Sequence, residues 1–202
     1  MQLIDLSSLS FSYNRKNSYF PAQKFVSYIF LMLLFLAGLT PISVVALDFS
    51  LEGIQKDLEN QHDNIRHIDG NSFSKLNHET IVLFDTREQI EFDVSHISGA
   101  IQLDPAISTQ AFINHFKNQI VGKDIVFYCS VGQRSSILAS RLKSALIEQG
   151  ANEVYNLKGG IFQWHNEQRE LIHDKNPTQF IHPYNPLWGL LLEEKKTIRF
   201  KP

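Results

Sequence analysis

The chain has a single cysteine, Cys129, and the residues around it are typical of a nucleophile. An apolar run, DIVFY at 124–128, comes directly before it, and helical spacing begins a few residues after it. A continuous apolar run is typical of a strand buried on both faces. Because ligands in open α/β sheets bind beyond the carboxyl ends of the strands, Cys129 stands where a ligand would bind.

The loop that follows Cys129 has the features of an anion-binding loop. Backbone N–H groups that lead into a helix favour negative charge, and Gly132 permits the backbone geometry that such a loop needs. Arg134 adds a permanent positive charge with a fork of donors. A lone cysteine is otherwise most often a small buried hydrophobe, but this context predicts a reactive thiolate. The residues expected to bind the substrate are Ser130, Val131, Gly132, Gln133, Arg134 and Ser135, and Ser135 is also expected to cap the helix.

Strand and helix patterns alternate on both sides of this loop. Apolar runs predict strands at 65–68, 81–84, 101–103, 124–128 and 153–155, and helical spacing predicts helices at 106–118, 135–149 and 160–169. Such alternation predicts an α/β fold with a mostly parallel sheet covered on both faces. The sequence shows no internal repeat, so we expect one domain of this kind.

The N-terminal part differs in composition from the rest. Residues 25–47 contain no charged residue, and the basic residues Arg15, Lys16 and Lys24 all precede them. We expect residues 1–47 to be a signal peptide or a membrane anchor, because a basic flank followed by an uncharged apolar run is typical of such segments. The basic flank would stay on the cytoplasmic side. The domain would then be exported, into the periplasm in a bacterium, or anchored outside the cytoplasm; an organelle transit peptide is the alternative. Residues 48–64 are expected to form a linker helix.

Three ordered segments resemble the rhodanese-like family of single-domain sulfurtransferases over residues 65–174. The loop CSVGQR resembles the family's active-site loop, with Cys129 first and Arg134 last. Upstream, DTREQIEFDVSHISGA matches a second signature, and downstream LKGGIFQW matches a Gly-Gly and Trp element. The upstream signature contains Asp85, Arg87, Glu88, Glu91, Phe92, His96, Ile97, Gly99 and Ala100, and the downstream element contains Gly159, Gly160 and Trp164.

The resemblance implies a five-stranded parallel sheet flanked by helices and sulfur transfer through a persulfide on Cys129. The donor would be a small sulfur-containing anion such as thiosulfate, and the acceptor a thiol or a cyanide-like nucleophile, free or on a protein. Asp85 and Arg87 would support the site. No cofactor is implied. We expect residues 175–202 to form a tail that packs back onto the domain.

Composition and spacing limit the alternatives. The formal net charge is −2, which argues against nucleic acid as a partner. The eight histidines show no zinc-type spacing with a cysteine, so no metal site is expected. A phosphatase or arsenate reductase is less expected, because its loop is one residue longer, Cys-x5-Arg against Cys-x4-Arg here. A sulfur carrier or partner-binding module with little thiosulfate turnover remains the main alternative.

Overall fold

The computed structural model describes residues 49–202. The expected signal or anchor segment at 25–47 lies outside these residues, so the compartment of the protein stays a prediction from the sequence. None of the helices between residues 49 and 202 combines the length and the apolar character that a membrane span requires.

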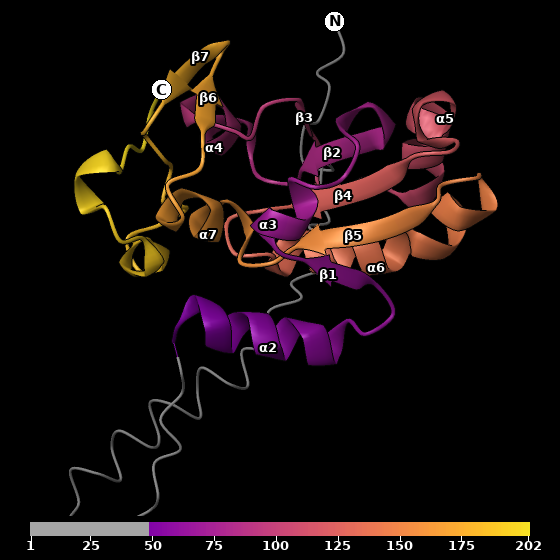
Figure 1. Ribbon diagram of the computed structural model, residues 1–202, viewed down its shortest axis with the longest axis horizontal. Coiled ribbons are helices and arrows are strands. Elements are labelled where there is room, and N and C mark those ends of the chain that lie inside the picture. Colours follow the sequence, from indigo (N-terminus) through magenta and orange to yellow (C-terminus); the bar gives the residue numbers. More distant parts are fainter. Residues whose placement is uncertain (1–48) are drawn as a thin grey trace, which may run out of the picture. The chain divides into compact units, whose positions relative to one another are not determined.

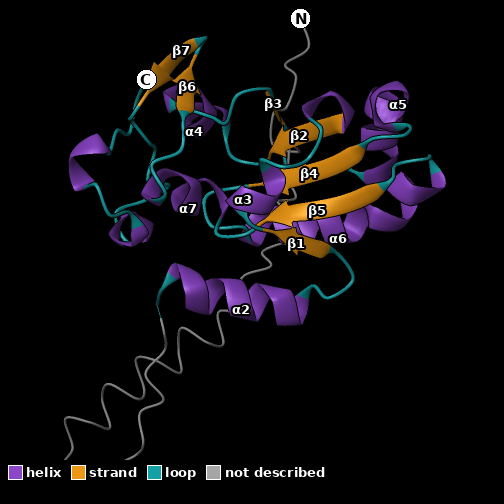
Figure 2. Cartoon of the chain, viewed as in Figure 1, coloured by secondary structure: helices purple, strands orange, loops and turns teal. Residues whose placement is uncertain are grey.

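Helices and strands alternate along the described chain (Figures 1 and 2). The helices are α2 (Leu51–Gln61), α3 (Gly70–Phe73), α4 (Gln89–Val94), α5 (Thr109–Ile120), α6 (Gln133–Glu148) and α7 (Gly160–Asn166). The strands are β1 (Arg66–Ile68), β2 (Ile81–Asp85), β3 (Ala100–Gln102), β4 (Asp124–Tyr128), β5 (Glu153–Leu157), β6 (Leu171–His173) and β7 (Asn176–Thr178). Three short 3-10 helices are η1 (His78–Thr80), η2 (Trp188–Leu191) and η3 (Lys195–Thr197).

Five of the strands form one parallel sheet in the order β1-β5-β4-β2-β3, which confirms the predicted α/β architecture. The sequence DIVFY forms the central strand β4, whose neighbours on the two sides are β5 and β2. The register pairs Asp85 at the end of β2 with Tyr128 at the end of β4. Cys129, the next residue, therefore lies at the carboxyl end of the middle of the sheet.

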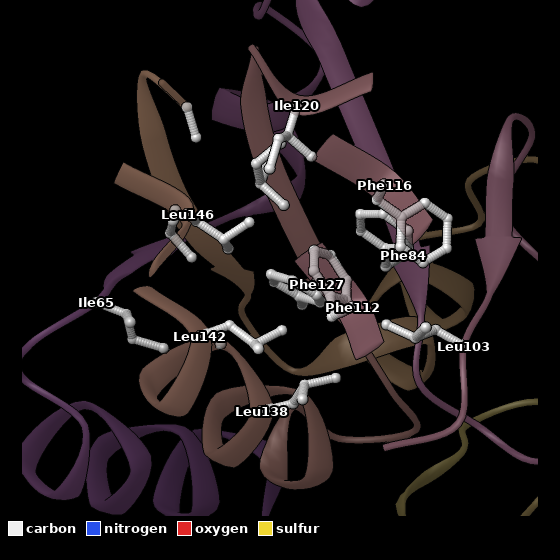
Figure 3. Packing of buried hydrophobic residues seen from close by; sticks show 14 residues of the cluster. Ile65, Phe84, Leu103, Phe112, Phe116, Ile120, Phe127, Leu138, Leu142 and Leu146 are labelled. Carbon is white, nitrogen blue, oxygen red and sulfur yellow. The ribbon is translucent and has the colours of Figure 1, made fainter. Parts of the chain in front are cut away.

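Each face of the sheet covers its own apolar cluster, because successive residues of a strand point to opposite faces. Phe84 and Phe127 pack with Phe112 and Phe116 of α5 and with Leu142 of α6 (Figure 3). The opposite face carries Leu83, Val126 and Tyr128, which pack with residues of α3, α7 and the C-terminal segment. Strands with apolar side chains on both faces are expected for a parallel sheet buried between helices.

The helix after β3 begins later than the sequence predicts. The expected start at Ala106 is wrong, because the Ala106 N–H donates to the Asp104 side chain (2.8 Å) and forms a turn. The helix instead begins at Thr109, where the side chain of Ser108 accepts a hydrogen bond from the Ala111 N–H (3.2 Å). Such a cap satisfies one of the N–H groups that have no partner at a helix start.

The helix after β5 ends earlier than predicted, and helix α4 and the hairpin β6–β7 were not predicted at all. Helix α7 ends at Asn166, shortly before Gln168 adopts a left-handed φ of 55°. Helix α4 and the antiparallel hairpin β6–β7 have short, mixed sequences without a clear period. At the N-terminal side, α2 lies within the expected linker helix and begins after a Ser50 cap.

Candidate active site

The loop between β4 and α6 holds Cys129 at the carboxyl end of the sheet. Cys129 is buried, with 1% of its surface exposed. Gly132 has a φ of 93° and is the residue from which α6 starts, at Gln133. A Cβ at position 132 would lie 3.1 Å from the Asn156 side chain, so both the backbone angle and the space favour glycine there.

Helix α7 fixes the orientation of this loop by binding its carbonyl groups. The Ile161 N–H donates to the Cys129 carbonyl (2.9 Å) and the Phe162 N–H to the Ser130 carbonyl (3.0 Å). In a trans peptide the N–H points opposite to the C=O of the same plane. The amides of Ser130 and Val131 therefore point away from α7.

The loop amides have no competing partner among residues 49–202. None of the backbone N–H groups of residues 130–135 donates a hydrogen bond within this part of the chain, and the side chains provide no cap at the start of α6. Consecutive unpaired amides at a helix start form a cradle for an anion. The geometry thus offers the N–H groups that an anion-binding loop requires, and anion binding itself stays a prediction.

Gly160 is the point at which α7 touches the loop most closely. Its φ is 55°, and a Cβ would lie 2.2 Å from the Cys129 carbonyl oxygen. Gly99 is a matched control, because it has a φ of 80° but nothing within 4 Å of a Cβ. We expect Gly99→Ala to lower the free energy of unfolding by about 1–2 kcal/mol from left-handed strain alone.

Gly160→Ala should lower the free energy of unfolding, measured in urea, by more than Gly99→Ala does, because the active-site loop must also move. It should also change the rate at which iodoacetamide alkylates Cys129, whereas Gly99→Ala should not. Equal unfolding free energies and equal alkylation rates for the two variants would show that the close contact at Gly160 does not constrain the loop.

Glu91 of α4 joins the loop through a buried cluster of hydrogen bonds. Its carboxylate, on a residue that is 1% exposed, accepts from both terminal nitrogens of Arg134 (2.8 and 3.0 Å) and from the Ser130 hydroxyl (3.0 Å). Glu91 also accepts from the Glu88 N–H (3.0 Å), which completes a capping box. Arg134 is therefore held as half of an ion pair beside Cys129.

The charges of this pair are stabilised mutually. Burial alone would raise the pKa of Glu91, but hydrogen bonds and charge from Arg134, with further help from Arg87, lower it overall. Burial alone would lower the pKa of Arg134, but Glu91 and the sulfur of Cys129 raise it overall. Both groups are therefore ionised at neutral pH.

Asp85 and Arg87 form a second, fully buried ion pair behind the cluster. The Arg87 guanidinium donates to both Asp85 oxygens (3.0 and 2.6 Å) and to the carbonyls of Glu91 (3.3 Å) and Ser95 (2.6 Å). Burial would lower the pKa of Arg87, but the charge and hydrogen bonds of Asp85, with smaller contributions from Tyr128 and Glu91, together raise it overall. Because these bonds hold the carbonyl of Glu91 itself and that of Ser95, the C-cap of α4, the pair acts on the site by placing Glu91.

Several predicted substrate-binding residues use their side chains for structure instead. The Ser130 hydroxyl bonds Glu91 and Arg134, and Val131 packs in the apolar cluster beneath α7. The prediction that Ser135 caps α6 is wrong: its hydroxyl donates to Asn156 of β5 (2.6 Å), and α6 starts two residues earlier. Of residues 130–135, only Gln133 is exposed. These residues can contribute to anion binding mainly through their N–H groups.

The hydrogen bonds behind Ser135 extend to α2. The Asn156 amide donates to Nδ1 of His67 (3.4 Å), and Gln55 of α2 also donates to this nitrogen (3.2 Å). Nε2–H of His67 donates to the His62 carbonyl (3.2 Å). A ring that accepts at Nδ1 and donates from Nε2 is the neutral imidazole. Burial lowers the pKa of His67, in agreement with the neutral ring.

Two parts of the site have no clear signal in the local sequence. Glu91 belongs to a quoted motif, but its sequence position does not reveal that it binds Arg134, 43 residues later. Tyr184, in the C-terminal segment, lies with its ring 4.8 Å from the Arg134 guanidinium carbon. Membership of that motif was the sequence clue for Glu91, and Tyr184 had none beyond the expectation that residues 175–202 pack back onto the domain.

Comparison with known proteins identifies the central part of the chain. Residues 72–167 match the family model described as a rhodanese-like domain. A tRNA uridine(34) hydroxylase of Rickettsia prowazekii (strain Madrid E) is 35% identical over 102 residues, which cover 48% of this chain and 37% of that protein. A protein of the same name from Staphylococcus haemolyticus (strain JCSC1435) is 30% identical over 112 residues, which cover 54% of this chain and 34% of that protein. The matched region thus spans about a third of these curated relatives.

Solved structures of low sequence identity resemble part of the chain. A thiosulfate sulfurtransferase from Pseudomonas aeruginosa is 19% identical, with a TM-score of 0.47, and covers 62% of this chain and 23% of its own. A rhodanese-related protein from Thermoplasma volcanium is 22% identical, with a TM-score of 0.42, and covers 54% of this chain and 99% of its own.

Proposed function

We propose, from the premise that residues 72–167 form a rhodanese-like domain, that this protein transfers sulfane sulfur through a persulfide on Cys129. The observation that supports this most is the loop itself: Cys129 is followed by amides at 130–135 that have no partner among residues 49–202, next to Arg134, which pairs with Glu91. A nucleophile and an anion cradle on one short loop suit a small anionic sulfur donor.

The transfer consists of two displacements at sulfur. The Cys129 thiolate attacks the outer sulfur of a donor such as thiosulfate, the sulfur–sulfur bond of the donor breaks, and sulfite leaves with the electron pair. The resulting persulfide anion is stabilised by the N–H groups of residues 130–135 and by the nearby charge of Arg134. An acceptor thiolate or cyanide then attacks the outer sulfur, and the Cys129 thiolate is the leaving group.

The acceptor is less determined than the donor chemistry. Arg134 is the only charged residue of the loop, and Glu91 already pairs with it, so thiosulfate gains less from this arginine than from an unpaired one. This favours a sulfur carrier that delivers to a specific thiol, free or on a partner protein, as the alternative to rapid thiosulfate turnover. We carry over no hydroxylase activity from the tRNA uridine(34) hydroxylases, because the match covers about a third of their length.

The persulfide itself is the direct test. Incubation with thiosulfate should add about 32 Da to the peptide that holds Cys129, because one sulfur atom is transferred to the thiolate. Cyanide should remove this mass and yield thiocyanate. The matched control is Cys129→Ser, which should gain no mass, since the chain has no second cysteine. Thiocyanate formation at the wild-type rate by Cys129→Ser would overturn the proposal.

A further inference from the structure

The C-terminal segment places an aromatic ring directly on the active-site loop. The ring of Tyr184 faces the Arg134 guanidinium, with 4.8 Å between the ring centroid and the guanidinium carbon. Glu91 binds the two terminal nitrogens of the same guanidinium. Arg134 is thus held by a carboxylate along its edge and by an aromatic face, a contact that attracts cations.

The backbone of Tyr184 is held in an unfavourable conformation. Its φ is 63°, a left-handed value that is uncommon for a residue with a bulky side chain. The Tyr184 N–H donates to Nδ1 of His182 (3.1 Å), and the Asn185 N–H donates to the Pro183 carbonyl (2.7 Å). Strained conformations persist only where the surrounding contacts determine them, so the position of this ring is a specified feature of the segment.

The rest of the segment holds this turn by pairing with itself and by a bond to α7, in which the Asn166 amide donates to the Leu191 carbonyl (2.9 Å). Ile181 is fully buried and pairs with the strand-like stretch at Ile198, through hydrogen bonds from Ile181 N–H to the Thr197 carbonyl (3.1 Å) and from Arg199 N–H to the Ile181 carbonyl (3.0 Å). Figure 1 shows this yellow segment beside α7, at the side of the sheet where β4 and β5 end. Tyr184 lies outside residues 72–167, the part that matches the family model.

We propose that Tyr184 is a positioning residue of the Cys129 site, whose ring holds the Arg134 guanidinium against Glu91 and beside the sulfur. This inference deepens the proposed function, since the fixed guanidinium is what recognises an anionic donor. It means that the C-terminal segment completes the active site. Without the ring, Arg134, whose side chain is 24% exposed, gains room to turn toward solvent.

Alkylation of Cys129 in the full chain tests this role without any sulfur donor. The probes are iodoacetate, which is an anion, and neutral iodoacetamide, and the quantity measured is the ratio of their two rate constants. Tyr184→Leu should lower this ratio about 3- to 10-fold, a range consistent with the loss of a partly exposed cation–π contact. Tyr184→Phe should keep the wild-type ratio, because the aromatic face remains.

A second variant controls for general changes in the segment. Leu190 is 64% exposed in the same segment, so Leu190→Ala should leave the ratio unchanged. An unchanged ratio in Tyr184→Leu, an equal fall of both rates, or a fall in Tyr184→Phe as large as in Tyr184→Leu would each overturn the proposal. Failure of persulfide formation in the wild type, with the ratio still falling in Tyr184→Leu, would reject sulfur transfer but keep the positioning role.

Discussion

Replacing Glu91 by alanine should lower the free energy of unfolding by about 3 kcal/mol, because it leaves a largely buried guanidinium without its partner. Removal of one partner from a buried ion pair costs about 3–5 kcal/mol. The lower end applies here, since the Arg134 side chain keeps 24% exposure and solvent screens part of its charge. Urea-induced unfolding measures this difference directly.

The surface pair of Glu194 with Lys196 provides the matched control. Their side chains are 51% and 78% exposed, with 3.2 Å between the charged atoms. An exposed pair of this kind contributes about 0–1 kcal/mol, so Glu194→Ala should have little effect. If Glu91→Ala costs no more than Glu194→Ala, the Glu91 cluster does not hold the loop.

The ion pair of Glu91 with Arg134 also predicts a loss of stability in acid. Folding lowers the pKa of Glu91 below its ordinary value of 4.5, chiefly because the bonds and charge of Arg134 outweigh the opposing effect of burial. A group with a lowered folded pKa stabilises the fold fully above its unfolded pKa, and this stabilisation is lost as the pH falls through the folded pKa. The stability difference between wild type and Glu91→Gln should therefore be constant at neutral pH and shrink below about pH 4.5.

The sheet and the reactive loop were predictable because their signals are local. The run IVLFD at 81–85 and the run DIVFY at 124–128 are buried on both faces, which few structures other than a parallel sheet strand accommodate. Cys129, Gly132 and Arg134 then follow within one loop. Residue type and spacing alone were sufficient to place Cys129 at the carboxyl end of a strand of the sheet.

The supporting contacts were not predictable because they connect distant parts of the chain. Helix α4 is six residues long, too short for its period to stand out, and the partner of its Glu91 lies 43 residues away. Serine is a common helix cap, but Gly132 occupies the N-cap position of α6 in a left-handed conformation. The Ser135 hydroxyl is therefore free to donate to Asn156. Tyr184 reaches Arg134 only because the segment after β7 is anchored beside α7.

Replacing Arg134 by alanine should weaken binding of an anionic donor by about 1.5–3 kcal/mol, the contribution of a hydrogen bond to a charged group. This corresponds to roughly a 10- to 150-fold higher KM for thiosulfate. The same change also leaves the Glu91 carboxylate buried without its main partner, so Arg134→Ala alone mixes a loss of recognition with a loss of stability.

The double variant Glu91→Ala/Arg134→Ala separates these two effects. Removing both charges should restore part of the unfolding free energy that either single change loses, because neither group is then buried unpaired. Donor binding should not be restored, since the guanidinium beside Cys129 is still missing. The measurements are urea unfolding and the KM for thiosulfate in all four proteins of the cycle. Recovery of a wild-type KM in the double variant would show that Arg134 acts on the donor only through the fold, and that the loop amides of residues 130–135 bind the anion without it.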